Sequence, residues 1–248
     1  MNVEQAFLSG KALIPFLTCG YPNLETTEQM IYALERAGAD LIQLGIPFSD
    51  PTAEGPILQI ASERALSAGV TTDKVFDLVK RVRGRITTPL AFMTYANIVF
   101  SYGTERFVRR MAELGVNALV LPDVPFEEKD EFDKVCRKAG VALIAFVAPT
   151  SGDRIKKIAL EAQGFIYLSP STDADEMVRA VRKFTSLPVV VDYGPGQFAD
   201  IATTADGIIV STFMEKIVEY GSTPDIIYDQ ARSMVAMMKG ADTRALVL

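Results

Sequence analysis

A short apolar segment is followed by a loop with two acidic residues that could do chemistry. Residues 41–45 (LIQLG) predict a buried strand, and the loop that follows is too rich in proline and glycine for a helix or a strand. Asp50 and Glu54 lie in this loop, and Gln43 lies within the strand. A carboxyl group can transfer a proton or accept a hydrogen bond from a substrate. The amide of Gln43 can donate and accept hydrogen bonds, but it cannot carry a proton between two substrate atoms.

Other polar residues lie in, or just after, further apolar segments. Hydroxyl and amide side chains there can contact a substrate, and glycine N–H groups beside a helix N-terminus can hold a phosphate group. The residues in question are Tyr95, Asn97, Asp123, Tyr167, Asp192, Gly194, Gly196, Ser211 and Thr212.

The composition excludes several other kinds of chemistry. The chain has no histidine, so a histidine triad, a histidine base and histidine metal ligation are ruled out. The two cysteines, Cys19 and Cys136, are isolated and favour a reducing compartment. A net charge of −6 argues against nucleic-acid binding, and no apolar stretch approaches the roughly 18 residues of a membrane span. We therefore expect a cytoplasmic protein with no metal, no cofactor, and no nucleic-acid or membrane partner.

The elements that position the polar residues are eight short apolar segments separated by amphipathic stretches. Several segments are nearly continuous in apolar residues, which is typical of strands buried on both faces of a parallel sheet. Between them apolar residues recur at helical spacing, as at Phe107, Met111 and Leu114, and glycines mark helix ends. The predicted strands are residues 13–19, 41–45, 90–94, 118–121, 142–147, 165–168, 189–192 and 207–210.

Eight strand–helix units without a dividing linker predict a single (β/α)8 TIM barrel over residues 1–248. Active sites in this fold lie at the carboxyl ends of the strands, which is where the polar residues fall. The lysines fall outside the predicted strands, so an aldolase that forms a Schiff base inside the barrel is disfavoured.

Residues 46–51 (IPFSDP) followed by residues 53–56 (AEGP) form a specific motif. Four further segments follow this motif in order along the chain: residues 93–97 (MTYAN), 121–125 (LPDVP), 164–167 (GFIY) and 205–210 (ADGIIV). With these segments, the sequence resembles the tryptophan synthase alpha subunit family. The resemblance implies a TIM barrel and a lyase that cleaves indole-3-glycerol phosphate to indole and glyceraldehyde 3-phosphate in tryptophan biosynthesis. It also implies a tryptophan synthase beta subunit as partner, contacted through the loop with Asp50 and Pro51 and through the loop after the third strand.

The resemblance assigns catalytic roles to Gln43 and Glu54. In the family the position of Gln43 normally holds a glutamate that shuttles protons, and the position of Glu54 holds a second carboxylate that binds the indole nitrogen. Residues implied to bind the substrate are Tyr95, Asn97, Asp123, Tyr167, Gly194, Gly196, Ser211 and Thr212. Because an amide cannot shuttle a proton, and general acid–base catalysis typically contributes about 10²–10⁴-fold, we expect weak or lost lyase activity.

Two further departures from the family pattern point the same way. The family carries a mobile loop with a Gly-Val-Thr-Gly motif after the sixth strand, whereas residues 168–172 here run almost directly into a helix that begins near Asp173. The family's phosphate-binding Gly-Phe-Gly is Asp-Tyr-Gly at residues 192–194, and its Gly-Ser is Ser-Thr at residues 211–212. We expect Asp192 to repel a phosphate dianion, so that phosphate binding is weak.

Two other functions remain open at this point. One is a non-catalytic, regulatory subunit that binds a beta-subunit-like partner. The other is a barrel enzyme for a different small substrate, with Glu54, Asp123 or Asp192 as its acid or base.

Structural roles also compete with the functional ones. Gln43 could be a buried residue satisfied by neighbouring backbone groups, and Asp50 could order its own loop. Asp123 could cap the helix predicted directly after it. Tyr95 and Tyr167 could simply pack at the barrel mouth.

Overall fold

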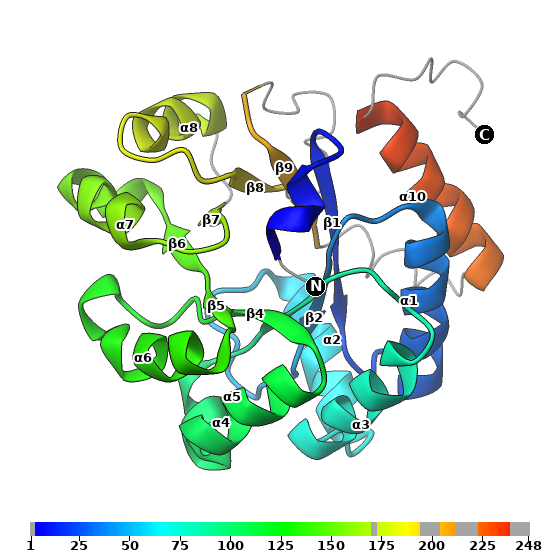
Figure 1. The fold of residues 1–248 in the computed structure, drawn as a ribbon. Coiled ribbons are helices and arrows are strands. Elements are labelled where there is room, and N and C mark those ends of the chain that lie inside the picture. The colour runs from blue at the N-terminus through cyan, green and yellow to red at the C-terminus, as the bar shows by residue number, and fades with distance from the viewer. Residues whose placement is uncertain (1–2, 170–172, 194–203, 212–222, 239–248) are drawn as a thin grey trace.

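Short parallel strands alternate along the chain with helices that surround them (Figure 1). The computed structural model describes residues 3–169, 173–193, 204–211 and 223–238. Within these residues nine parallel strands form one sheet in the order β5-β4-β3-β2-β1-β9-β8-β7-β6.

The strands are β1 (Ala12–Thr18), β2 (Ile42–Gly45), β3 (Leu90–Met93), β4 (Val116–Val120), β5 (Ala142–Leu143), β6 (Ala145–Val147), β7 (Ile166–Leu168), β8 (Val189–Tyr193) and β9 (Gly207–Val210). The α-helices are α1 (Leu24–Ala37), α2 (Pro56–Ser67), α3 (Thr72–Arg83), α4 (Ala96–Tyr102), α5 (Thr104–Glu113), α6 (Asp130–Ala139), α7 (Ile155–Glu161), α8 (Ala174–Arg182) and α10 (Pro224–Met238), and the 3₁₀ helices are η1 (Val3–Phe7), η2 (Phe126–Glu128) and η3 (Pro149–Arg154).

β5 and β6 are two halves of the one strand predicted over residues 142–147, and together they close the barrel. β5 pairs with β4, β6 pairs with β7, and only Ile144 lies between the two halves. The backbone N–H of Ile144 donates to the carbonyl oxygen of Leu119, at 2.9 Å. The chain thus stays hydrogen-bonded while it passes from one neighbouring strand to the other. Eight strand positions form a closed ring, and the predicted TIM barrel is confirmed.

Residues at alternating strand positions face two different cores. The inner core, inside the barrel, includes Leu41, Ala91, Val190 and Ile209, and all four side chains are fully buried. Adjacent residues such as Ile42 pack outward against the helices. Because both faces of the sheet are covered, the strands are apolar almost throughout, which is the pattern that the sequence showed.

The short helix η1 fills one end of the barrel and lies close to the centre of the ring in Figure 1. Val3 and Ala6 are buried in the inner core, and the ring of Phe7 lies 5.8 Å from that of Phe165, centroid to centroid. These residues contact the beginnings of the strands. The opposite end, where the carboxyl ends of the strands lie, is therefore the expected entry for a ligand.

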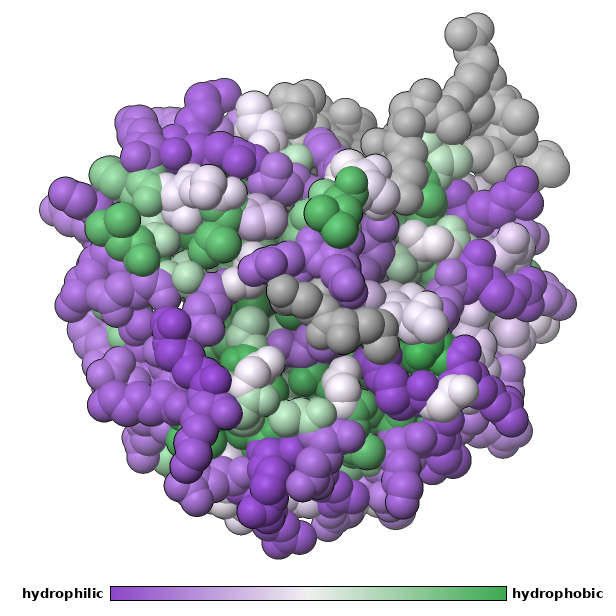
Figure 2. All heavy atoms as spheres, viewed as in Figure 1, coloured by the Kyte–Doolittle hydropathy of each residue, from purple (hydrophilic) through white to green (hydrophobic). Residues whose placement is uncertain are grey.

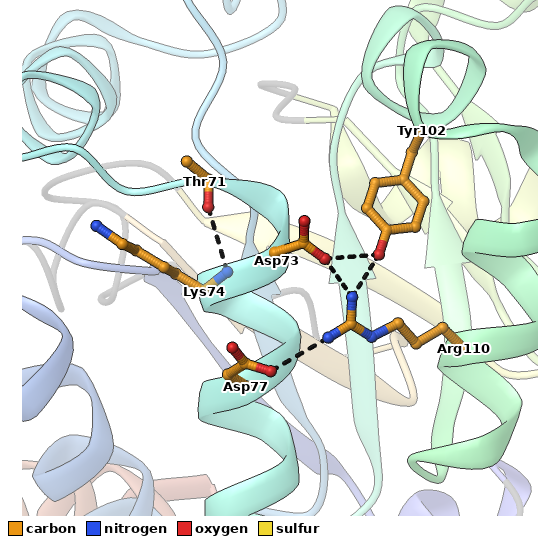
Figure 3. Close-up of polar contacts among 6 residues, drawn as sticks. All are labelled: Thr71, Asp73, Lys74, Asp77, Tyr102 and Arg110. Carbon is orange, nitrogen blue, oxygen red and sulfur yellow. Dashed lines mark hydrogen bonds and ion pairs between the residues drawn. The ribbon is translucent and has the colours of Figure 1, made fainter.

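Polar contacts fix the outer helices to one another, as Figure 3 shows for α3 and α5. Arg110 of α5 forms ion pairs with Asp73 and Asp77 of α3, and it also donates to the hydroxyl group of Tyr102. Its guanidinium group lies 4.6 Å from the centroid of the Phe76 ring. This network joins α3, α4 and α5 in the outer layer.

The helix α10 packs on α1 and completes the helical layer at the point where the ring of strands begins. Ile227 and Ala231 of α10 share a buried cluster with Ile31 of α1. The Arg36 guanidinium lies over the Tyr228 ring, 4.4 Å from its centroid. The first and last described helices are thus neighbours in space.

The surface seen in Figure 2 is hydrophilic over most of the outer helices, and hydrophobic residues gather over α7 and toward the centre, where the strands lie. Among the described residues, none of the helices has both the length and the apolar character needed to cross a membrane.

Gly45 at the end of β2 is required because the ring of Phe16 lies against it. A Cβ atom at position 45 would lie 2.9 Å from Cε2 of Phe16 and closer still to Cζ. We therefore expect Gly45→Ala to lower the free energy of unfolding by about 1–3 kcal/mol, since a packed core must shift to admit the methyl group. Urea denaturation measures this.

Gly55→Ala is the matched control. Gly55 has an ordinary φ of −74°, and a Cβ atom added there would meet no heavy atom within 4 Å. If Gly45→Ala and Gly55→Ala lower the free energy of unfolding equally, the Phe16 ring can move aside without a measurable cost.

Candidate functional site at the barrel mouth

Four side chains form a polar layer above the inner core at the carboxyl ends of the strands. Each follows an inner-core residue by two positions, and residues two apart on a strand face the same side of the sheet. The inner-core residues are Leu41, Ala91, Val190 and Ile209, and the side chains above them are Gln43, Met93, Asp192 and Ser211. The alternation of side chains along the strands thus directs an amide, a thioether, a carboxyl group and a hydroxyl group into the barrel mouth.

Gln43 is fully buried and lies against Met93. Its Nε2 atom donates to Sδ of Met93, at 3.0 Å, and a thioether is only a weak acceptor. Within the described part of the chain, Oε1 of Gln43 has no hydrogen-bond partner. The amide is therefore not satisfied by neighbouring backbone groups. A buried carbonyl oxygen without a donor is unfavourable, and a ligand with an N–H or O–H group could satisfy it.

Glu54 approaches the same region from the loop after β2. The Tyr95 hydroxyl group donates to Oε1 of Glu54, at 3.3 Å, and accepts the backbone N–H of Ala53, at 3.2 Å. Phe48 stacks on Tyr95, with ring centroids 5.0 Å apart. Oε2 of Glu54 is buried and has no hydrogen-bond partner among the described residues. Burial raises the pKa of Glu54 to about 7, and the hydrogen bond from Tyr95 offsets part of that rise.

Asp192 at the end of β8 is held by two hydroxyl groups. Tyr167 of β7 donates to Oδ2, at 2.8 Å, and Ser211 donates to Oδ1, at 3.2 Å. Burial raises the pKa of Asp192 to about 6, which the two hydrogen bonds partly offset. Burial also raises the pKa of Tyr167, with smaller contributions from the charges of Asp192 and Glu54, and the nearby side chain of Gln43 opposes the rise.

The expectation that Asp192 repels a phosphate group stays a prediction, because residues 194–203 and 212–222, which follow β8 and β9, lie outside the described residues. Among the described residues the carboxyl group points toward Tyr167 and Ser211, because position 192 continues the inward alternation of Val190.

The other predicted residues are less central. Asp123 is exposed, and both of its carboxylate oxygens accept the N–H of Ala96, at 3.1 and 3.0 Å. It therefore caps α4, and the alternative that it caps the helix after it is wrong. Asn97 is also exposed, and its Oδ1 accepts the hydroxyl group of Ser101 at 3.4 Å. These residues lie at the rim and contact none of the inward layer.

In the partner loop, Asp50 is exposed and Pro51 is buried. Gly194, Gly196 and Thr212, predicted to bind the substrate, lie outside the described residues, as do residues 170–172 of the shortened loop. Among the described residues, no group of three or more cysteine or acidic side chains could hold a metal ion.

Sequence reasoning did not find two contacts of this site. Met93 was identified only as part of a motif, yet it is the hydrogen-bond acceptor of Gln43. Phe48 orders Tyr95 by stacking. Period-two alternation from Ala91 could have placed Met93 beside Gln43, whereas no local signal predicts the stacking of Phe48.

The raised pKa of Glu54 predicts a stability that falls as the pH rises. Its ordinary value is 4.5 and its value in the fold is about 7, so between these values the folded state binds more protons than the unfolded state. Stability therefore decreases with pH across this window, by at most about 3 kcal/mol from this group. Glu54→Gln should flatten the decrease in chemical denaturation from pH 4.5 to 8.

Glu63→Gln, at an exposed position on α2, is the control and should leave the slope unchanged. Asp192 has a pKa shifted in the same direction and adds to the slope in both variants. An unaltered slope in Glu54→Gln would mean that the Glu54 carboxyl group is solvated in the fold.

Comparison with known proteins reveals close relatives along almost the whole chain. A family model described as tryptophan synthase alpha chain matches residues 5–242. The tryptophan synthase alpha chain of Lacticaseibacillus casei is 41% identical over 231 residues, which are 88% of this chain and 87% of that protein. The solved tryptophan synthase subunit alpha of Campylobacter jejuni has a TM-score of 0.83 and 35% identity over 91% of this chain and 96% of that one. A chain in the solved tryptophan synthase complex of Pyrococcus furiosus has a TM-score of 0.84 and 29% identity over 93% and 98%.

Proposed function

Because this chain belongs to the tryptophan synthase alpha chain family, we propose that it cleaves indole-3-glycerol phosphate to indole and glyceraldehyde 3-phosphate at a reduced rate. The observation that carries the proposal is the Glu54 carboxyl group. It is tied on one oxygen by Tyr95 and has its other oxygen buried without a partner among the described residues. An indole N–H group is a donor that would satisfy that oxygen.

The chemistry explains why an anion is needed there. A proton adds to C3 of the indole ring, which places a positive charge on the ring nitrogen. The bond between C3 and the glycerol chain then breaks, its electron pair returns to the ring, and the adjacent hydroxyl group loses its proton to become the aldehyde. An ionised Glu54 beside the N–H group stabilises the charged intermediate more than the neutral substrate.

The reduced rate follows from Gln43. One proton must be given to the ring carbon and one must be taken from the hydroxyl group, and an amide can do neither. Losing a well-placed acid–base group typically lowers a rate by about 10²–10⁴-fold. Gln43 can still bind the substrate through Oε1, which has no partner among the described residues.

A beta-type subunit is the proposed partner, and a regulatory role is the second candidate function. A groove between the loop after β2 and helix α2 is lined by Phe48, Pro51 and Ile60, and the Ile60 side chain is 45% exposed. The related Pyrococcus furiosus chain comes from a tryptophan synthase complex. We propose this groove, which Asp50 and Pro51 of the partner loop also line, as the surface that contacts the beta-type subunit.

The test is indole release from indole-3-glycerol phosphate by the purified chain, alone and with a tryptophan synthase beta subunit. Saturable release that the beta subunit stimulates would support the lyase. A chain that activates the beta subunit without releasing indole would be the regulatory subunit, and the lyase proposal would be wrong.

A further inference from the structure

The barrel mouth contains a second carboxyl group, on the strand side opposite the Glu54 loop, that the proposed mechanism has not used. Asp192 is partly exposed, so a ligand in the mouth can reach it, whereas Tyr167 is only 2% exposed. The Tyr167 hydroxyl group donates to the carboxyl group and fixes its orientation from below. Ser211 fixes the other oxygen.

Tyr167 connects this carboxyl group to the position where proton transfer is missing. Its hydroxyl group contacts Asp192, and the side chain of Gln43 lies near enough to influence it. Oε1 of Gln43 is buried and has no hydrogen-bond partner among the described residues. Gln43 and Asp192 each follow an inner-core residue, Leu41 and Val190, by two positions, so alternation directs both side chains to the inside of the barrel. A group that can donate and accept protons therefore lies on the same inner side as the amide.

We propose that Asp192 is the residue that transfers protons to and from the substrate in this barrel, and that Tyr167 positions its carboxyl group. The inference rests on the proposed lyase function, and it names the acid and base of that reaction. Asp192 in its protonated form gives its proton to C3 of the indole ring. It then takes the proton of the glycerol hydroxyl group as the carbon–carbon bond breaks, and it ends the cycle unchanged.

The surroundings of Asp192 suit both halves of this cycle. Its pKa of about 6 lies near neutral pH, so both the protonated and the ionised form are accessible. Among the described residues, the titratable group in contact with Asp192 is Tyr167, whose own pKa also responds to the charge of Glu54. Two hydroxyl donors keep the carboxyl group in one orientation, which proton transfer requires.

A structural role for Asp192 would have the same contacts, so the test must separate the two. Asp192→Asn removes the proton carrier and keeps the shape. The matched control is Asp133→Asn, because Asp133, like Asp192, accepts two side-chain hydrogen bonds, in its case from Gln163 and Arg137 at 2.7 Å each. The double variant Gln43→Glu with Asp192→Asn returns a carboxyl group to the mouth from another strand.

Two reactions are measured for each protein, together with its thermal melting. The first is indole release from indole-3-glycerol phosphate as a function of pH. The second is exchange of the C3 hydrogen of free indole with D2O, followed by proton NMR. This exchange needs acid–base transfer at C3 but no phosphate group and no cleavage of a carbon–carbon bond. Both rates should fall at least about 10²-fold in Asp192→Asn, recover in the double variant, and stay unchanged in Asp133→Asn.

Tyr167→Phe tests the positioning residue. It should keep exchange but shift the pH limb of Asp192 upward, because a hydrogen bond that stabilises the ionised carboxyl group is lost. A merely structural tyrosine would lower the melting temperature and leave the pH limb in place.

The outcomes separate the two proposals. One result is that the wild type shows exchange that Asp192→Asn abolishes, but no release of indole. That result would overturn the lyase proposal and leave the assignment of Asp192 standing. Release that persists in Asp192→Asn would leave the lyase standing and overturn the assignment. Absent exchange, or exchange that Asp192→Asn does not change, would also overturn the assignment.

Discussion

Replacing Gln43 by glutamate is expected to raise the rate of indole release by at least about 10²-fold. The new carboxyl group occupies the same fully buried volume and lies against Sδ of Met93. Burial favours the protonated form of a carboxyl group, which is the form that donates a proton to the indole ring. The gain should be largest in the background of Asp192→Asn, because one carboxyl group then replaces the other. Single-turnover assays of indole formation measure both backgrounds.

Gln59→Glu is the control for this first prediction. Gln59 is exposed on α2, and its side chain donates to the backbone carbonyl of Glu54, so the change adds a carboxyl group near the same loop without reaching the barrel interior. If this control gives the same gain, the effect is general electrostatics. An unchanged rate in Gln43→Glu would instead identify the loop and phosphate regions as the rate-limiting defect.

Removing the charge of Glu54 should have a comparably large effect in the opposite direction. Glu54→Gln keeps an oxygen acceptor beside Tyr95, but it can no longer stabilise the positive charge on the protonated ring. We expect indole release to fall by about 10²–10³-fold, as when a well-placed electrostatic contact is removed from a transition state. The loss should appear mainly in kcat, because neutral substrate needs only the acceptor.

The pH dependence gives this second prediction a signature. Only the ionised carboxyl group is active, and its pKa in the fold is about 7. The proposed mechanism also needs Asp192 in its protonated form, with a pKa of about 6. In the wild type, kcat/KM should therefore rise to a maximum between about pH 6 and 7 and then fall, and in Glu54→Gln the rise should vanish and only the fall remain. Glu63→Gln, at an exposed position on the same segment of chain, should keep the rise. A pH profile that is the same in Glu54→Gln and the wild type would exclude Glu54 from the charged intermediate.

The barrel itself was predictable because its strands are buried on both faces. Each of the eight apolar segments coincides with a strand position, and differences are confined to one or two terminal residues and to the break at Ile144. That break could not be read from the sequence, since it reflects which neighbour each half pairs with. Pairing depends on the stagger of the whole ring.

The candidate site was predictable in position but not in its contacts. Residue types after each strand identified Gln43, Glu54 and Tyr167, and alternation directs such side chains inward. The contacts of Asp192 with Tyr167 and Ser211 were not predicted, because both partners come from other strands. Such a contact depends on three strands at once, and no local pattern records it.

The position of β1 in the ring has a consequence for how the protein is made. Residues 16–18 pair with β2, but residues 12–15 pair with β9, whose first residue is Gly207. Ribosomes add about 5–20 residues per second, so one edge of β1 waits on the order of 10–40 s for its partner. During that time the nascent chain exposes an apolar strand with free backbone groups, which is the kind of segment that aggregates or is held by chaperones. The yield of soluble protein in a cell is thus tied to translation speed and chaperone supply as well as to the stability of the finished barrel.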